Sequence, residues 1–98
     1  MSDMTGLDLT RKLIAFDTIS PPGNELDCAT FLAELLEPAG FKIKRHDWQP
    51  QRPNLIATLP ATETPARDAL VYSGHLDTVP LGQAEWAVDP FAGEIRQG

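Results

Sequence analysis

The sequence predicts an α/β domain, and three patterns within its 98 residues support this class. Apolar residues recur at helical spacing in two N-terminal segments, residues 6–17 and 24–39. Alternating or continuous apolar stretches then follow at residues 41–44, 54–59 and 69–72, as is typical of strands. Helices followed by strands of mixed polarity pack as layers around one core, so we expect an α/β fold.

The first predicted helix runs from about Gly6 to Asp17. It begins with a capping box, Thr5 to Asp8, in which a hydroxyl and a carboxylate three residues later satisfy the first helix amides. The apolar residues that share one face of this helix are Leu9, Leu13 and Phe16.

The second predicted helix follows a break at Pro21-Pro22-Gly23, with Asn24 as its N-cap and Asp27 near the positive end of its dipole. One continuous apolar stripe requires this helix to pack on another element. The stripe consists of Cys28, Phe31, Leu32, Leu35, Leu36 and Ala39. Pro38 lies in the last turn, and Gly40 is placed to end the helix in a left-handed conformation.

Three strands are expected after the second helix. The first begins at Phe41, where apolar residues alternate with lysines, and a turn at Pro50–Pro53 separates it from a second strand, Asn54 to Leu59. The third, Ala69 to Tyr72, is apolar throughout, which suits a sheet covered on both faces. The chain beyond it is rich in turn residues and reads as a surface loop, with one further hint of extended structure at Glu94–Arg96.

Composition and charge exclude several classes of function. Fourteen acidic and eight basic residues give a net charge of -6, so no nucleic-acid partner is expected. No apolar run approaches the roughly 20 residues that span a bilayer, and the N-terminus lacks a signal-peptide pattern. The single cysteine, Cys28, excludes an internal disulfide framework. We therefore expect no membrane association and a cytoplasmic location.

The chemistry-bearing residues are His75 and Asp77, which follow the third predicted strand. Residues two apart in an extended chain point to the same face, and open α/β sheets bind ligands at the carboxyl ends of their strands. A metal-ligating imidazole needs an acceptor on its other ring nitrogen, so His75 would be the ligand and Asp77 the residue that orients it. For this tripeptide alone, a strand-end histidine bonded to a neighbouring acid is the more ordinary interpretation.

The sequence around this pair matches a longer pattern. The matching stretches are Leu70 to Pro80, Trp86, Asp89-Pro90-Phe91, Ile19 to Glu25, Ala39-Gly40-Phe41 and Asn54 to Ala57. With them the chain resembles, over nearly its whole length, the zinc-dependent amidohydrolase and metallopeptidase family of acetylornithine deacetylase, succinyl-diaminopimelate desuccinylase, aminoacylase and related carboxypeptidases. Gly74 to Pro80 is the most specific part of the resemblance.

The resemblance implies that residues 1–98 are the N-terminal portion of a catalytic domain, a three-layer α/β/α fold with a mixed sheet, and that no second domain is present in this chain. It implies a site for two zinc ions, with cobalt or manganese as alternatives. His75 would be a terminal metal ligand, and Asp77 the catalytic residue that clamps its imidazole. The bridging aspartate, the glutamate base and the remaining ligands lie in a later part of the family's chain.

The resemblance also implies an activity, which is hydrolysis of the amide bond of N-acyl amino acids. The partner of the complete protein would be a small N-acyl amino acid or peptide substrate, and the complete protein is expected to be a homodimer. A dipeptidase or carboxypeptidase of the same family is one alternative. A truncated homologue that binds a partner chain without catalysis is another, and the 98-residue segment alone is expected to be inactive.

Other conspicuous residues have structural interpretations. His46 lies on a lysine-rich strand and should face solvent. Cys28 should be a small buried hydrophobe and not a nucleophile. Trp86 and Phe91 would either line a substrate cleft or cover the sheet edge, and the sequence does not decide between these two positions.

Overall fold

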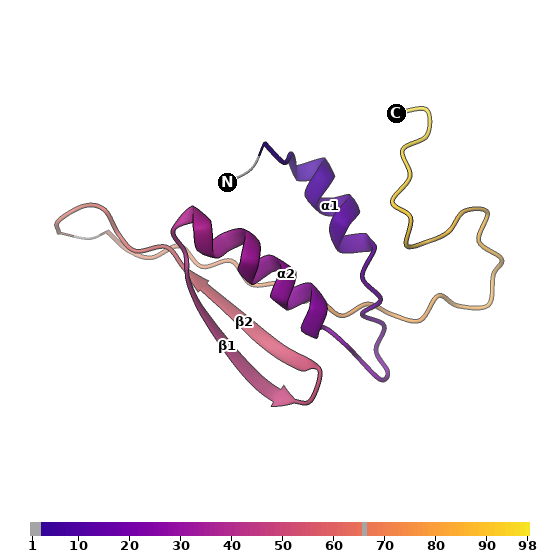
Figure 1. Ribbon diagram of the computed structural model, residues 1–98, viewed down its shortest axis with the longest axis horizontal. Helices are drawn as coiled ribbons and strands as arrows, with labels where there is room; N and C mark the ends of the chain where they lie inside the picture. Colours follow the sequence, from indigo (N-terminus) through magenta and orange to yellow (C-terminus); the bar gives the residue numbers. More distant parts are fainter. Residues whose placement is uncertain (1–2, 66) are drawn as a thin grey trace.

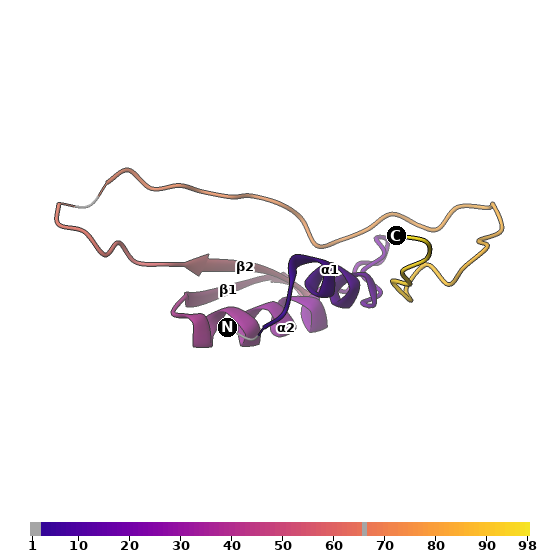
Figure 2. The same cartoon turned by 90° about the horizontal axis from the view of Figure 1, so that it is seen from above.

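The computed structural model describes residues 3–65 and 67–98, which form two helices and a two-stranded antiparallel sheet. The elements are α1 (Gly6–Ile14), α2 (Leu26–Leu36), the short 3-10 helix η1 (Glu37–Ala39), β1 (Lys42–Gln49) and β2 (Arg52–Thr58). Helix α2 lies against the β1–β2 hairpin, and the chain after β2 turns back as a long extended segment (Figures 1 and 2). No helix among the described residues combines the length and the apolar character needed to cross a membrane.

Helix α1 begins as predicted and ends earlier. The capping box is formed, because the Asp8 amide donates to Thr5 Oγ1 at 3.1 Å and the Thr5 amide donates to Asp8 Oδ2 at 3.1 Å. The helix ends at Ile14, so the prediction of helix to Asp17 was wrong. The Asp17 carboxylate instead accepts a hydrogen bond from the Ile19 amide at 3.2 Å, a local turn that competes with helix continuation.

Helix α2 has an N-cap that the sequence did not predict. Glu25, not Asn24, is the N-cap residue, and its side chain makes no capping bond to the helix. The Gln51 carbonyl in the β1–β2 turn accepts hydrogen bonds from the amides of Glu25 at 2.9 Å and Leu26 at 3.1 Å. The first amides of α2 are thus satisfied by a residue distant in sequence, which makes an asparagine cap unnecessary.

The core of the described chain lies where α2 packs on β2. Cys28 and Ala29 are its buried apolar residues, and the Phe16 and Phe31 rings extend the contact toward α1 with centroids 5.6 Å apart. Within the predicted stripe, Cys28 is buried, and the other members are half-buried: Phe31, Leu32, Leu35, Leu36 and Ala39. The α-helix ends at Leu36, earlier than expected, and Pro38 lies in η1 and not in the last turn of α2. Gly40 ends η1 in the left-handed conformation that was predicted.

The β1–β2 hairpin has a shorter turn than the sequence predicted. Its strands pair from Lys42 opposite Thr58 to Gln49 opposite Arg52, with an irregularity between Asp47 and Gln49. The turn contains only Pro50 and Gln51, because Gln51 adopts a φ of +66° that reverses the chain within two residues. Arg52 and Pro53 therefore belong to β2, which spans Arg52–Thr58 and not Asn54–Leu59.

The third predicted strand is not formed within the described residues. Leu70, Val71 and Tyr72 are extended but 78 to 89% exposed, and no strand pairs with them. A strand requires a neighbouring backbone, and none of the described segments supplies one at this place. Glu94–Arg96 is likewise irregular. The α/β class is confirmed as two helices and a two-stranded sheet, as in a piece of a larger domain. The predicted three layers and mixed sheet are not formed by residues 3–65 and 67–98.

Candidate functional site

The candidate site is a short segment, His75 to Thr78, docked on the connection between α1 and α2. Three hydrogen bonds hold it, from the Thr78 amide to the Thr18 carbonyl (3.0 Å), the Ser20 amide to the Thr78 carbonyl (2.9 Å), and Thr18 Oγ1 to the Leu76 carbonyl (2.8 Å). Ile19 and Thr78 thereby form an isolated parallel bridge. Thr18 is buried beneath this segment and was not identified from the sequence.

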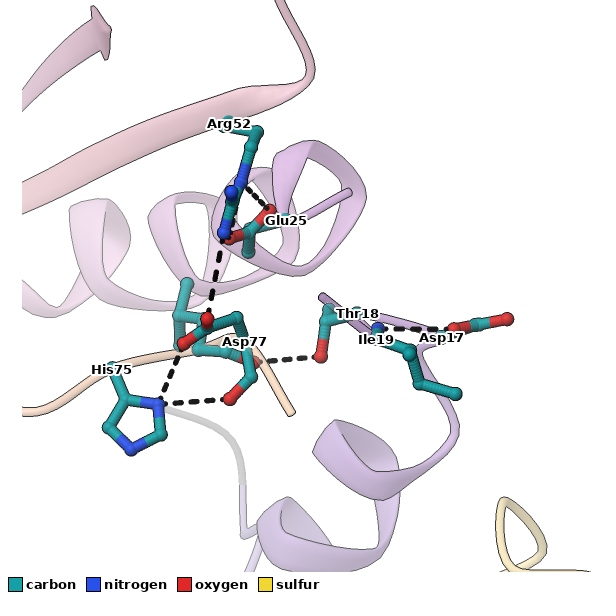
Figure 3. A network of polar contacts seen from close by, with 8 residues as sticks. Asp17, Thr18, Ile19, Glu25, Arg52, His75 and Asp77 are labelled. Atoms are coloured by element: carbon teal, nitrogen blue, oxygen red, sulfur yellow. Dashed lines mark hydrogen bonds and ion pairs between the residues drawn. The ribbon is translucent and has the colours of Figure 1, made fainter. Parts of the chain in front are cut away.

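The structure brings His75 and Asp77 together, as their spacing predicted. His75 Nδ1 lies 2.8 Å from Asp77 Oδ1 and 2.9 Å from the Asp77 carbonyl oxygen (Figure 3). Both partners accept hydrogen bonds, so a neutral ring carries its proton on Nδ1 and leaves a lone pair on Nε2. This is the tautomer that a histidine metal ligand requires, and the exposed imidazole leaves Nε2 accessible.

Arg52 connects this pair to the start of α2. Its Nη2 lies 3.6 Å from Asp77 Oδ2 and 2.7 Å from Glu25 Oε1, while its Nε donates to the same Glu25 carboxylate at 3.1 Å (Figure 3). The hydrogen bonds to Glu25 raise the pKa of the Arg52 guanidinium above its ordinary value. The Arg52 and Glu25 side chains are only 16% and 10% exposed, which makes this ion pair the most shielded in the described chain.

Two further residues fix the position of the guanidinium. The Trp48 ring lies beneath it, with Arg52 Cζ 5.1 Å from the ring centroid. Gly23 lies against it with a φ of +82°, and a Cβ added there would stand 2.3 Å from Arg52 Cζ. Gly23 therefore supplies both an unusual backbone conformation and space for the arginine, where the sequence indicated only a helix break.

Sequence reasoning missed Glu25, Arg52 and Gly23 as parts of one network. Glu25 and Gly23 were noticed within the Ile19 to Glu25 stretch, and Arg52 was assigned to a turn. A carboxylate and a guanidinium 27 positions apart carry no local pattern. Their pairing becomes visible only when the hairpin places Arg52 beside the start of α2.

The remaining candidates take up the following positions. His46 is exposed, as predicted. Cys28 is buried as predicted, and desolvation raises the pKa of its thiol, which disfavours a reactive thiolate. The Trp86 indole donates to the Leu81 carbonyl at 3.1 Å within its own loop, and Phe91 is half-buried. Their roles at a cleft or a sheet edge stay predictions.

The described residues could supply part of a metal site, but not a complete set of ligands. No group of three or more histidine, cysteine, aspartate or glutamate side chains that could hold an ion occurs among residues 3–65 and 67–98. His75 presents an accessible imidazole nitrogen on a ring held by a carboxylate, which fits one ligand position of a zinc site.

Several proteins contain a segment that is similar to all or nearly all of this chain. Succinyl-diaminopimelate desuccinylase of Methylorubrum populi is 38% identical over 99 residues, covering 100% of this chain and 25% of that protein. The desuccinylase of Stenotrophomonas maltophilia is 40% identical over 93 residues, covering 94% of this chain and 23% of that protein. N-formyl-4-amino-5-aminomethyl-2-methylpyrimidine deformylase of Halalkalibacterium halodurans is 31% identical over 94 residues, covering 94% of this chain and 22% of that protein.

No family model matches the chain, and no solved structure matches it. The curated relatives, taken with the α/β elements, define its class as that of the amidohydrolases. The chain belongs to the amidohydrolase family that includes the succinyl-diaminopimelate desuccinylases, which confirms the resemblance seen in its motifs. It spans about a quarter of the length of the curated relatives it matches.

Proposed function

We propose that the complete protein containing this segment is a metal-dependent hydrolase that cleaves the amide bond of an N-acyl amino acid, as acetylornithine deacetylases and succinyl-diaminopimelate desuccinylases do. The observation that carries the proposal is the 2.8 Å contact between His75 Nδ1 and Asp77 Oδ1. Relatives matching this chain are named for removing a succinyl or a formyl group, which supports acyl removal as the reaction class.

His75 Nε2 would be the terminal ligand of one zinc ion, with cobalt or manganese as alternatives. Imidazole is a common ligand of zinc, and the two alternative ions rest on the resemblance. The resemblance assigns the bridging aspartate, the second histidine and the glutamate base to residues beyond this segment. Two bound ions would polarise the scissile carbonyl and activate the attacking water.

Asp77 would serve the reaction by holding the His75 ring. Its carboxylate keeps the proton on Nδ1 and the lone pair on Nε2, and it prevents the ring from turning away. A negatively charged acceptor also makes the imidazole a more basic ligand. Asp77 would thus act on the metal through His75.

The complete protein provides the test. It should hydrolyse at least one of a set of N-succinyl, N-acetyl and N-formyl amino acids, and His75→Ala should lower both its metal content and its turnover. His46→Ala is the matched control, because His46 is exposed on β1 and should leave both unchanged. Full metal content and activity in His75→Ala would refute the proposal. Cleavage of dipeptides without cleavage of any N-acyl amino acid would establish the peptidase alternative instead.

We also propose that residues 1–98 form the N-terminal portion of a catalytic domain and are inactive alone. The exposed apolar segment at residues 70–72 and the match to about a quarter of each relative support the view that these residues are a piece of a larger domain. A reducing, cytoplasmic location is supported by the single buried thiol of Cys28. The proposal that the complete protein is a homodimer rests on the family resemblance alone. Light scattering on the complete protein would test it.

A further inference from the structure

The side chains around Asp77 form a graded series from the interior to solvent. Glu25 is the most buried, followed by Arg52 and Asp77, and His75 is the most exposed at 83%. The order of contact follows the same path, because Glu25 touches Arg52, Arg52 touches Asp77, and Asp77 touches His75 (Figure 3). Glu25, at the buried end of this series, is therefore the residue with the least freedom to move.

The two oxygens of the Asp77 carboxylate have different partners. Oδ1 accepts from His75 Nδ1 at 2.8 Å, and Oδ2 faces Arg52 Nη2 at 3.6 Å. A carboxylate with one partner is free to rotate about its last side-chain bond, whereas partners on both oxygens define its plane. The position of Arg52 thus bears directly on the angle at which Asp77 meets the imidazole.

Arg52 is itself held on several sides. The Glu25 carboxylate accepts hydrogen bonds from Arg52 Nε and Nη2, and the Trp48 ring lies against the guanidinium. The guanidinium also lies so close to the Gly23 backbone that no side chain fits at that position. The Gln51 carbonyl, one residue before Arg52, accepts the amides that start α2 and so keeps Glu25 in place. A planar guanidinium suits this arrangement, while a lysine would lack the two-pronged geometry.

We propose that Arg52 is a positioning residue that acts through Asp77 on His75, with Glu25 as its anchor. The inference rests on the proposed function, because ring orientation matters for activity only if His75 binds metal. It assigns to the β1–β2 hairpin a role in metal binding that neither the His75–Asp77 motif nor the names of the relatives contain.

The test compares variants of the complete protein. Arg52→Met should weaken zinc binding, measured by competition with a chromophoric chelator, and lower kcat by about 10-fold each, with KM changed by less than about 2-fold. In the zinc-free protein, nitrogen NMR of the imidazole should show His75 moving from the Nδ1-protonated form toward a mixture of tautomers. Arg52→Lys should restore only part of each property.

Arg45→Met is the matched control. Arg45 also pairs with an aspartate on the same hairpin, but the Arg45–Asp47 pair is exposed and does not touch the site. Its removal should leave zinc affinity, the His75 tautomer and kcat unchanged. An equal loss in Arg45→Met and Arg52→Met would overturn the proposal, since it would show a general effect of charge on the hairpin.

A second variant separates positioning from folding. Arg52→Met leaves the Glu25 carboxylate buried without its partner, which by itself destabilises the protein. Combining Glu25→Gln with Arg52→Met removes that unpaired charge. If Arg52 positions Asp77, the double variant keeps the low kcat and the mixed tautomer; recovery of wild-type values would mean that Arg52 serves stability alone.

The outcomes also distinguish this inference from the proposed function. Loss of zinc in His75→Ala together with unaltered zinc binding in a folded Arg52→Met protein would overturn the role of Arg52 and leave the hydrolase proposal standing. Retention of zinc in His75→Ala would remove the proposed function. The tautomer measured without metal would then still show whether Arg52 orients the pair.

Discussion

Substituting Gly23 by alanine should cost about 2.5 to 5 kcal/mol in free energy of unfolding, and this cost has two parts. An L-residue at a φ of +82° costs about 1 to 2 kcal/mol. The added Cβ would stand 2.3 Å from Arg52 Cζ, so the guanidinium must leave its place beside Glu25. Losing a hydrogen bond to a charged group costs about 1.5 to 3 kcal/mol more.

Gly82 offers a matched control for the backbone part of this cost. It has nearly the same φ, +80°, with nothing within 4 Å of an added Cβ, so Gly82→Ala should show the φ cost alone. Urea unfolding of the complete protein measures both variants, and placing Gly23→Ala in an Arg52→Met background should remove the difference between them. Equal costs for the two glycines in the wild-type background would refute the contact between Gly23 and Arg52 as an energetic feature.

Four further predictions concern the site, the substrate and the fold. In the complete protein, His75→Ala should lower metal content, whereas Asp77→Asn should retain more metal but lose about 10- to 100-fold in turnover; elemental analysis beside kinetics decides this, and full activity in both variants contradicts it. The isolated 1–98 segment should unfold without a sharp transition and aggregate through its exposed apolar stretch, and a soluble monomer with a cooperative melt by circular dichroism would disprove this. The substrate should carry a free carboxylate that is bound by groups outside residues 73–98, because that stretch holds four acidic residues and one basic residue. Carboxamide analogues should therefore show a lower kcat/KM than the carboxylates, and equal values would contradict the carboxylate requirement. Hydrogen bonds in the capping box lower the pKa of Asp8 below its ordinary 3.8. The ionised carboxylate should therefore stabilise α1 above pH 3.8, and this stabilisation should be lost as the pH falls through the lowered pKa. Asp8→Asn should abolish the pH dependence of the helical circular dichroism signal, and an unchanged pH profile would argue against a stabilising capping box.

Local patterns predicted the features that depend on neighbouring residues. The capping box at Thr5, the left-handed Gly40 after η1 and the burial of Cys28 all follow from residues within a few positions of each other. The contact between His75 and Asp77 belongs to the same group, because a spacing of two in extended chain places both side chains on one face. Short-range geometry was sufficient in each case.

Features that depend on distant segments were predicted poorly. The start of α2 was misassigned because its amides bond to Gln51 and not to the Asn24 side chain. The strand expected at Ala69–Tyr72 has the right composition, but composition does not supply a neighbouring strand. The Glu25–Arg52 pair joins residues that no single-sequence pattern connects.

The hydrogen bonds to the Gln51 carbonyl make the stability of the N-terminal end of α2 depend on the β1–β2 hairpin. The first amides of a helix ordinarily lack partners and exchange their hydrogens quickly with solvent. Here the amides of Glu25 and Leu26 both donate to a carbonyl that is in place only once the β1–β2 turn has formed. Their hydrogen exchange should therefore follow the opening of the hairpin and not the fraying of α2, so the two elements behave at this point as one cooperative unit.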